Sequence, residues 1–478
     1  MKLRKFLKKY YPNLNVRYNH SIENITDYDK DVMTNGIFVS LSDLTYIENA
    51  VNLGAKTIVL NSKYKKSKFT KSKKVNYLFV DSPIVFLARI IREVISNLDK
   101  KPIIVGITGT SGKTTSLNIL YEVLKKENYD VLAVGTHFVY SYYGLIEEKS
   151  ETNNTTLSLS KLYTLLKKKN FDYDYLIMEV SSEGIMKSRI LGLEFDVVSI
   201  TNITSDHMNY HKTKESYIHA KERLLYHAAV DLIFNNDDEV VRSFKELTIK
   251  NIITYGINSG DVTAKYLNLD TSQTEFYIED NKINYYIKTN LLGEFNVYNI
   301  LNVWCILKSL KIDPKLLIKI LNHDQVIPGR MNKINKGNIC FIVDYAHTVN
   351  EVEAVLTYFN KIKGNNKLIT IIGCGGSRDK TKRSIIGSYV CNQCDYVYFT
   401  EDNSRDENVY DIISDMVRDI KTTNYEIIKS RKECIKKAYL DNLNNNAVIL
   451  VLGKGNEQYL IKGNNKIPYN DIEEINNL

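Results

Sequence analysis

This sequence of 478 residues lacks any long apolar run and any leader-like start. A helix needs about 18 consecutive apolar residues to span a bilayer, and no such stretch occurs, so we expect no membrane span. The basic N-terminus MKLRKFLKKYYPNLNV has no apolar core after its charges, unlike a secretory signal. These absences predict a cytoplasmic location.

Cysteine and proline are scarce, with six residues of each. All six cysteines lie in the second half of the chain, and Cys391 and Cys394 form a lone CxxC pair. A zinc site needs a second pair of ligands at suitable spacing, and the sequence offers none. We therefore expect reduced cytosolic thiols and no zinc site.

A strong charge of one sign is also missing, because 64 basic and 56 acidic residues leave a net charge of +8. This mild excess suits an anionic ligand. No run of Lys or Arg is interleaved with aromatic residues, so we expect no nucleic-acid partner. Hydrophobic residues make up 44% and charged residues 25%, which is typical of a globular protein, and the length corresponds to about three domains.

Alternating strand and helix patterns predict an α/β fold with a small first domain at residues 1–99. Residues 36–41 and 55–60 have the pattern of strands, and residues 45–54 and 84–97 that of helices. This domain is expected to bind an acceptor.

Two larger α/β domains are expected after it. Residues 100–326 contain the apolar runs IIVGIT, DYLIMEV, DVVSITNI and VDLIFNN, several of them separated by helical segments. That alternation predicts a doubly wound parallel sheet. Near Ile327 the pattern restarts with ICFIVDYA, KLITIIG, YVYFTE and AVILVLG. A C-terminal Rossmann-like domain is therefore expected at residues 327–478.

A phosphate-binding turn is predicted at Gly106–Thr115, where GITGTSGKTT stands between a strand and a helix. Backbone N–H groups and the helix dipole at such a turn bind anions. Lys113 can reach the β- and γ-phosphates of a nucleotide, and Thr114 can ligate Mg²⁺. The spacing is GxxGxxGKT rather than GxxxxGK[ST], but strand, turn and helix stand in the right order.

Candidate metal ligands follow two further strands. Glu179 lies at the end of LIMEV, and Asp206 and His207 follow DVVSITNI. The carboxyl ends of parallel strands share one edge of a sheet, which is also the edge of the phosphate turn. We expect Glu179, His207 and Thr114 around magnesium, a hard cation that prefers oxygen ligands and tolerates an imidazole.

Eleven strings together resemble the Mur ligases of bacterial cell-wall synthesis. In chain order they are GITGTSGKTT, NTTLSLS, MEVSS, TNITSDHMNYH, AKERLL, LLGEFNVYN, IPGRM, VDYAHT, GCGGSRDKTKR, TEDNSR and GKGNE, and they extend from about Gly106 to Glu457. VDYAHT and GCGGSRDKTKR are most similar to the branch that adds the third residue of the peptidoglycan stem, the UDP-N-acetylmuramoyl-tripeptide synthetases.

The resemblance implies a role for each matching position. Lys113, Lys221, Glu179 and His207 would be catalytic, with Lys221, on a predicted helix, carbamylated. The metal ligands would be Thr114, Glu179, His207 and Lys221. ATP would be held by Thr110, Ser111, Gly112, Lys113, Thr114, Thr115, Asn296, Asn299, Arg330 and Asp344. The acceptor would be held by Thr155, Thr156, Ser181 and Arg189, and the incoming amino acid by Arg378, Asp402, Asn403, Arg405, Gly453 and Glu457.

The implied activity is ATP-dependent formation of an amide bond through an acyl phosphate, with ATP and Mg²⁺ as cofactors. The acceptor would be UDP-N-acetylmuramoyl-L-alanyl-D-glutamate, and the enzyme would be a monomer acting on small molecules. Arg405 favours meso-diaminopimelate over L-lysine as the added amino acid, because a distal carboxylate needs a cation.

The sequence departs from the family pattern at four motif positions and in its first domain. Leu157 and Ser404 replace prolines, while Glu183 and Asn456 replace histidines. NITDYDKDV and SLSDLTYIENA stand where the family's uridine-contacting turns lie.

Three other functions therefore stay open. The chain could be a ligase for a non-muropeptide carboxylate, a P-loop kinase or NTPase switch, or an inactive binding homologue.

Overall fold

The computed structural model describes the chain except residues 43, 68–71, 137, 142–143, 149–154, 170, 205–207, 271, 324–326 and 328. The chain divides into two compact units, each formed from several segments. The first comprises residues 1–108, 124–198 and 220–232, and the second residues 109–123, 199–219 and 233–478. The domain boundaries expected at residues 99 and 326 stay predictions.

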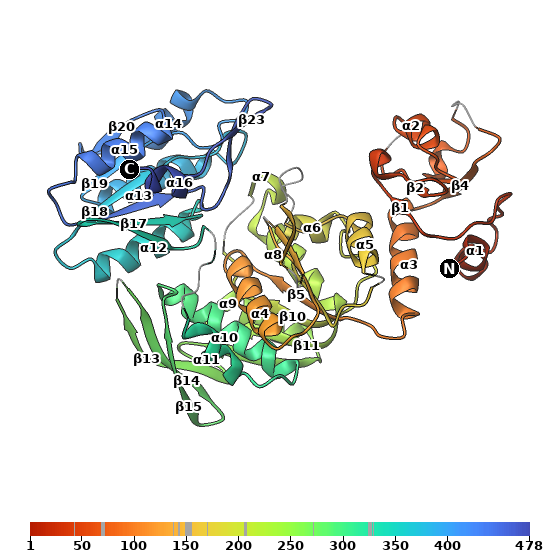
Figure 1. Cartoon of the computed structure of the whole chain (residues 1–478), viewed down its shortest axis with the longest axis horizontal. Coiled ribbons are helices and arrows are strands. Elements are labelled where there is room, and N and C mark those ends of the chain that lie inside the picture. The colour runs from red at the N-terminus through yellow and green to blue at the C-terminus, as the bar shows by residue number, and fades with distance from the viewer. Residues whose placement is uncertain are drawn as a thin grey trace. The chain divides into compact units, whose positions relative to one another are not determined.

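The first unit begins with a small α/β layer (Figure 1, red). Four parallel strands pair in the order β1-β2-β3-β4. Helix α2 packs against Phe38, Ile58 and Leu60 of the sheet, and helix α3 packs against β2 and β3. The elements are α1 (Leu3–Tyr10), β1 (Ile25–Thr26), η1 (Asp29–Asp31), β2 (Ile37–Val39), α2 (Ile47–Asn52), β3 (Thr57–Asn61), η2 (Ser62–Tyr64), β4 (Asn76–Val80) and α3 (Pro83–Ser96). The two strands and two helices expected here are confirmed, whereas α1, β1 and β4 were not anticipated.

A second sheet follows, in which β5 lies between β9 and β10, with β6 beyond β9. The pairs β5–β9 and β6–β9 are parallel. All five residues of β9 are buried, as expected for a parallel strand that is covered on both faces. The elements are β5 (Ile103–Thr108), β6 (Val131–Val134), β7 (Phe138–Ser141), β8 (Gly144–Glu148), α5 (Leu159–Lys168), β9 (Tyr175–Glu179), α6 (Ser182–Met186), β10 (Phe195–Ile200), η3 (Arg223–His227) and β11 (Ala228–Asn235).

The second unit contains the helix after the phosphate turn and an antiparallel extension, β13–β15. Burial alternates along β14, so one face of this extension meets water. The prediction of a wholly parallel sheet missed this extension, as it missed the antiparallel pairs β6–β7 and β7–β8. The elements are α4 (Lys113–Lys126), α7 (Met208–His211), α8 (Lys214–Glu222), α9 (Glu239–Ser243), η4 (Phe244–Leu247), β12 (Asn251–Gly256), β13 (Val262–Leu269), β14 (Thr274–Asp280), β15 (Ile283–Thr289), α10 (Glu294–Ser309) and α11 (Lys315–Leu321).

The last sheet, of order β16-β17-β21-β18-β19-β20, has the expected Rossmann-like form (Figure 1, blue). Its strands point alternate residues into two cores, one under α12, α13 and α14 and the other under α15 and α16. The elements are β16 (Asn332–Lys336), β17 (Ile339–Asp344), α12 (Val349–Ile362), β18 (Lys367–Ile372), α13 (Thr381–Gln393), β19 (Tyr396–Phe399), α14 (Val409–Val417), β20 (Tyr425–Ile427), α15 (Arg431–Leu440), β21 (Ala447–Leu452), β22 (Tyr459–Lys462), β23 (Asn465–Pro468) and α16 (Asp471–Asn476).

None of the helices in the described part of the chain is both long and apolar enough to cross a membrane. All six cysteines are free, as expected for reduced thiols.

Candidate active site

The phosphate turn is built by two glycines with backbone conformations that side chains disfavour. Gly109 has a φ of +148° and Gly112 a φ of +86°. A Cβ on Gly112 would lie 2.3 Å from Asn299 Oδ1, so only glycine fits against that amide. Helix α4 begins at Lys113, which places its N-terminal N–H groups at the turn.

The turn is held by the segment that follows β10. Thr110 N donates to Asn202 O at 2.8 Å, and Ser111 N donates to Asn202 Oδ1 at 2.9 Å. The Lys113 ammonium folds back on its own loop, where it donates to Gly109 O and Thr110 O, each at 2.7 Å. A phosphate with good oxygen acceptors can replace these carbonyls.

A cavity of about 350 Å³ opens beside this turn, within the second unit. The walls include seven positions predicted to hold ATP, namely Ser111, Gly112, Thr115, Asn296, Asn299, Arg330 and Asp344. Sequence reasoning missed other wall residues, among them Asp237, Asp238, Phe295, Tyr298, Asn350 and Glu351. Asn296 Oδ1 accepts a hydrogen bond from Asn299 Nδ2 at 3.0 Å, so the two predicted asparagines act as a pair.

Glu351 is the most informative of the missed residues. It belongs to the capping box at the start of α12, and its carboxylate accepts a hydrogen bond from Ser111 Oγ of the phosphate turn at 2.9 Å. Although burial raises it, the charges of His347 and Arg330 and the Ser111 bond lower the pKa of Glu351 to about 2. A permanent anion therefore lies beside the phosphate turn, where it orients Ser111. No motif signalled this contact, because its partners are 240 positions apart.

Arg330 and Asp344 are brought together at the cavity wall. The Arg330 guanidinium lies 5.0 Å from the centroid of the Tyr345 ring, and Asp344 accepts hydrogen bonds from Met331 N and Ala346 N, both at 2.8 Å. Burial raises the pKa of Asp344, against the opposing effect of Arg330. This carboxylate at the end of β17 suits a polar ligand such as a ribose hydroxyl.

We predict that Gly112→Ala weakens nucleotide binding at least about tenfold and destabilises the fold by about 1–3 kcal/mol. The added Cβ would be strained at positive φ and would meet Asn299. Thermal unfolding and ATP titration measure the two effects. Gly144→Ala is the matched control, because its φ is +108° and no atom of the described residues lies within 4 Å of the added Cβ. Equal ATP affinity in both variants would contradict the assigned contact.

Glu179 and Lys221 both lie beside β5 in the first unit. Glu179 is fully buried and pairs in register with Ile107, two residues before the phosphate turn begins at Gly109. Its carboxylate accepts bonds from Thr136 N at 2.9 Å and Thr136 Oγ1 at 2.8 Å. The Lys221 ammonium is also buried and donates to Thr108 Oγ1 at 3.4 Å. His207 lies outside the described residues.

The four predicted acceptor residues form one hydrogen-bonded group next to Glu179. Thr156 Oγ1 accepts from Ser181 N at 2.8 Å and lies 3.2 Å from Ser181 Oγ, while Arg189 donates to Thr156 O at 3.1 Å. Thr136 joins Thr155 to Glu179 through its hydroxyl. Glu183, which departs from the family pattern, lies 3.8 Å from Arg189 and so contributes to its position.

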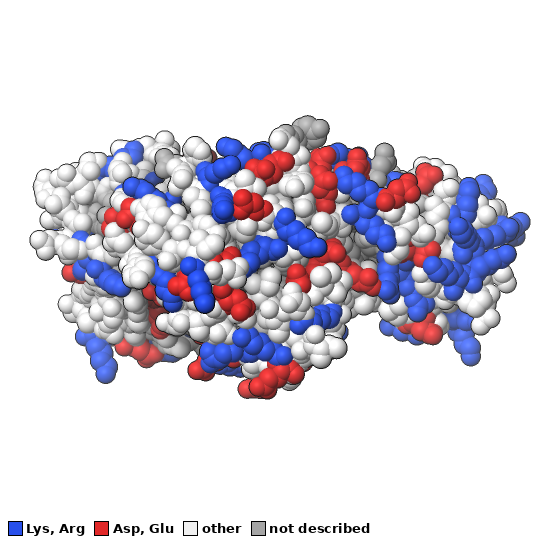
Figure 2. Space-filling view, turned by 90° about the horizontal axis from the view of Figure 1, so that it is seen from below, with Lys and Arg blue, Asp and Glu red and all other residues white. Residues whose placement is uncertain are grey.

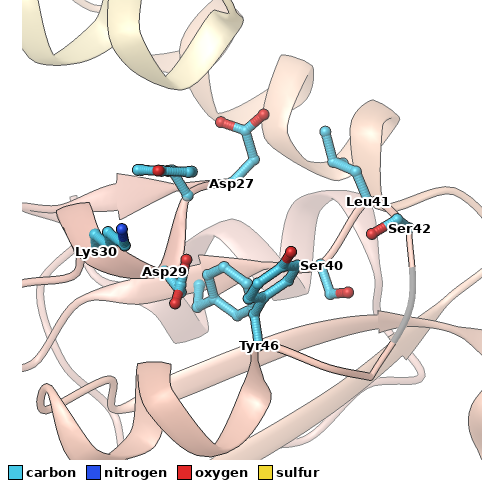
Figure 3. Close-up of a pocket in the computed structure, with 9 residues that line it drawn as sticks. Asp27, Asp29, Lys30, Ser40, Leu41, Ser42 and Tyr46 are labelled. Atoms are coloured by element: carbon cyan, nitrogen blue, oxygen red, sulfur yellow. The ribbon is translucent and has the colours of Figure 1, made fainter. Parts of the chain in front are cut away.

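A separate pocket of about 310 Å³ opens at the carboxyl ends of β1 and β2 (Figure 3). Eight of its nine lining residues come from the two segments that the sequence marked as divergent, and the ninth is Phe38 of β2. In Figure 3 the ring of Tyr46 lies between Asp29 and Ser40. Asp27 accepts a hydrogen bond from Ser160 of α5. The lining residues are Asp27, Tyr28, Asp29, Lys30, Phe38, Ser40, Leu41, Ser42 and Tyr46.

The predicted amino-acid site lies at the carboxyl edge of the last sheet and contains two carboxylates. Asn403 Nδ2 donates to Glu457 Oε2 at 2.7 Å. The fully buried Lys454, which the sequence did not single out, donates to the same oxygen at 2.7 Å and lies 3.8 Å from Asp402. Although burial raises it, the charges of Lys454 and Arg431 lower the pKa of Asp402.

Two arginines face this edge across Gly375. A Cβ on Gly375 would lie 3.1 Å from Arg405 Nη1 and 3.7 Å from Arg378 Cγ. Burial and the neighbouring charge of Arg378 lower the pKa of Arg405. Arg405 has a φ of +49°, and its side chain donates to Gly376 O at 2.9 Å and Asn403 O at 3.2 Å. Asp402, Gly453 and Glu457 complete the predicted set, and Gly453 leaves space for Asp402 Oδ2.

Comparison with known families decides the identity. A model of the Mur ligase middle domain matches residues 107–307, and a model of the Mur ligase glutamate ligase domain matches residues 329–455. A 2,6-diaminopimelate ligase of Clostridium acetobutylicum is 33% identical over 96% of this chain and 94% of its own length. This relative is named UDP-N-acetylmuramoyl-L-alanyl-D-glutamate--2,6-diaminopimelate ligase 1.

The chain belongs to the Mur ligase family. It is therefore an ATP-dependent ligase, as the resemblance implied. The same-named ligase of Clostridium tetani is also 33% identical, over 99% of this chain and 98% of its own.

Solved Mur ligases confirm the fold. A UDP-N-acetylmuramoyl-L-alanyl-D-glutamate--2,6-diaminopimelate ligase covers 99% of this chain and 98% of its own, with a TM-score of 0.66 and 24% identity. A MurF ligase of Thermotoga maritima in complex with ADP covers 95% and 96%, with a TM-score of 0.67 and 19% identity. The expected class, an α/β Mur ligase with N-terminal, central and C-terminal domains, is confirmed.

The donor set fits the magnesium expected for this family. The Thr114 hydroxyl and Glu179 carboxylate are buried oxygen donors, the type that Mg²⁺ prefers. Among the described residues there is no cluster of three or more His, Cys, Asp and Glu, and the metal-ligand roles stay predictions.

The buried Arg383 connects the loops of the predicted amino-acid site. The sequence motifs did not single it out. Arg383 donates to Glu407 Oε2 at 3.0 Å, to Asp415 at 2.8 Å and to Gly375 O at 3.3 Å. Glu407 also accepts from Ser377 N at 2.5 Å. Arg383 thus holds the loop with Arg378 against the loop with Arg405.

Proposed function

We propose that the protein joins a diamino dicarboxylic acid, meso-diaminopimelate, to UDP-N-acetylmuramoyl-L-alanyl-D-glutamate. The observation that supports this most directly is the charge pattern of the amino-acid site. Two guanidinium groups adjoin Gly375, while Asp402 and Glu457 lie beside a single buried ammonium. Such a set matches two carboxylates and an ammonium on one small molecule. Two relatives are named for the same pair of substrates, UDP-N-acetylmuramoyl-L-alanyl-D-glutamate and 2,6-diaminopimelate.

The chemistry follows from the weakness of a carboxylate as an acyl donor. A carboxylate oxygen attacks the γ-phosphorus of ATP, and the bond between that phosphorus and the β-phosphate oxygen breaks. ADP departs, and the acceptor now carries an acyl phosphate. The amine of the incoming amino acid then attacks the acyl carbon, loses a proton and expels inorganic phosphate. Lys113 and the start of α4 stabilise charge on the phosphates, and Asn296 and Asn299 hold the adenine side.

Thr114, Glu179, His207 and Lys221 are the proposed magnesium ligands. When bound, Mg²⁺ neutralises phosphate charge during transfer. Lys221 contributes after reaction of its neutral amine with carbon dioxide, which forms an N–C bond and releases a proton. Its burial supports this role, because a buried ammonium is costly, whereas a carbamate can be paired with a cation.

The acceptor is proposed to lie against Thr155, Thr156, Ser181 and Arg189, with its nucleotide in the pocket of Figure 3. The rings of Tyr28 and Tyr46 can stack on a base, and the Arg189 guanidinium can hold a carboxylate. We also propose that the enzyme is a cytoplasmic monomer. The free cysteines support the location, because disulfides are rare in that compartment.

The decisive assay follows inorganic phosphate release with ATP, UDP-N-acetylmuramoyl-dipeptide and each of two amino acids. With meso-diaminopimelate we expect release of inorganic phosphate and a product whose mass is the sum of the two substrates minus one water. With L-lysine we expect little turnover. A phosphorylated product without free phosphate would indicate a kinase instead. The residues that line the pocket of Figure 3 depart from the family's sequence pattern. Titrating the enzyme with UDP-N-acetylmuramoyl-dipeptide alone therefore tests whether this molecule is the acceptor. Failure to saturate would favour a non-muropeptide carboxylate.

A further inference from the structure

The whole net charge of the molecule resides in its first 99 residues. They contain 17 basic and 9 acidic side chains, whereas the rest of the chain contains 47 of each. Figure 2 shows Lys and Arg gathered over this region, at the right of the view. The charge is therefore a property of one region and not an even bias in composition.

Six of these cations lie on Tyr18's own segment or on segments that contact it and its neighbours, and together they are here called the basic face. Lys56 lies 4.2 Å and Arg17 5.4 Å from the centroid of the Tyr18 ring, whose hydroxyl donates to Lys73 O at 3.1 Å. Leu3 N, at the start of α1, donates to His20 O at 2.9 Å. The members of the basic face are Lys2, Arg4, Arg17, Lys56, Lys73 and Lys74.

The basic face is fixed to the amino ends of the strands. His20 Nε2 is 2.7 Å from Oγ1 of Thr57, the first residue of β3, and Tyr18 N donates to Oδ1 of Asn76, the first residue of β4, at 3.0 Å. The pocket of Figure 3 opens instead at the carboxyl ends of β1 and β2. In a parallel sheet these are opposite edges, so the basic face is not a wall of that pocket.

The cations of the basic face are available to an external partner. Five of the six are exposed and Lys56 is partly exposed. Within the described part of the chain, none of them forms an ion pair with an acidic side chain. Burial and the nearby charges of Lys56 and Lys2 lower the pKa of His20, as expected where positive charge is concentrated.

We propose that the basic face docks on an anionic phospholipid surface and holds the enzyme loosely on a membrane. Clusters of four to eight Lys and Arg gain roughly a fivefold factor in affinity per side chain near such a surface. The proposed contact does not insert α1 into the bilayer, because its residues Leu3, Phe6 and Leu7 are buried in the domain. Single-stranded nucleic acid fits less well, since it needs exposed rings for base stacking, and Tyr18 is covered by its cations.

The test compares sedimentation with vesicles of phosphatidylcholine alone and of phosphatidylcholine mixed with phosphatidylglycerol. We expect the wild type to bind only the anionic vesicles and to be released at about 1 M salt, where the Debye length is about 3 Å. The variant Lys2→Glu, Arg17→Glu, Lys73→Glu, Lys74→Glu should bind at least about tenfold more weakly. Retained ligase activity and an unchanged unfolding temperature would show that it folds.

A matched control separates the surface from total charge. Lys361, Lys367, Lys421 and Lys436 are exposed and lie in the C-terminal region, and their fourfold change to Glu alters the net charge equally. This control should bind vesicles like the wild type. Equal loss in both variants, or no vesicle binding by the wild type, would overturn the proposal. Binding to a single-stranded RNA homopolymer but not to vesicles, lost in the first variant alone, would assign the surface to nucleic acid instead.

Discussion

Replacing Lys221 by alanine should reduce ligase turnover at least about 100-fold, without loss of the folded state. The ammonium of this lysine is buried beside Thr108, at the end of the strand that leads into the phosphate turn. A carbamate there would convert a cation into an oxygen ligand for magnesium. The unfolding temperature is measured in parallel, so that a loss of turnover in the folded enzyme is distinguished from a loss of folding. Phosphate release and thermal unfolding measure the two effects.

Chemical rescue distinguishes a carbamate from an ordinary buried amine. Short carboxylates such as acetate should restore part of the turnover of Lys221→Ala, because they can supply the missing oxygen ligands. Lys214→Ala is the matched control, since Lys214 is exposed on the same helix, α8. Its turnover should equal that of the wild type. Full activity of Lys221→Ala without added carboxylate would show that the carbamate assignment is wrong.

Replacing Arg405 by alanine should raise the KM for meso-diaminopimelate about 100-fold and leave the ATP affinity within about twofold. The guanidinium adjoins Gly375 and Arg378, at the edge that also holds Asp402 and Glu457. Arg405→Lys should recover little, because a lysine ammonium cannot bind a carboxylate through two parallel bonds. Steady-state kinetics with each substrate varied in turn measure these effects.

The comparison with lysine reveals which end of the amino acid Arg405 binds. If it binds the distal carboxylate, the variant should lose most of the preference for meso-diaminopimelate over L-lysine. Arg418→Ala is the control, because its side chain is 64% exposed and it directly follows α14, at the end away from the loops of the site. An unchanged preference in Arg405→Ala would assign the arginine to loop structure alone. That role is a real alternative, since Arg405 already bonds to Gly376 O and Asn403 O.

Motifs were predicted well where they coincide with strand ends. Gly109 and Gly112 follow β5, Glu179 ends β9, and Asp344 ends β17. Apolar strands are recognisable from a few adjacent residues, and parallel pairing then places their ends on one edge. The four acceptor residues Thr155, Thr156, Ser181 and Arg189 are likewise close together, as the motifs implied. Their roles toward substrate stay predictions.

Residues that act through distant partners could not be predicted. Ser111 meets Glu351 and Arg383 meets Glu407 and Asp415 only because separate loops fold onto one another. Lys454 has no local signal, since a lysine between two glycines is usually exposed. The antiparallel extension β13–β15 was missed because its alternating polar residues suit one solvated face, a weaker pattern than a buried run.

The sequence by itself determined the chemistry that this chain carries. Its glycine turn and strand-end carboxylate indicate a phosphate and metal site, because local spacing dictates which backbone shapes and donor groups are available, and its ordered motifs resemble those of Mur ligases. Only the tertiary structure decided which groups share a site. The pocket of Figure 3, the charge pairing of Lys454 with Asp402 and the basic face each bring together side chains from separate segments. Burial and charge proximity are properties of packing, which no single segment encodes.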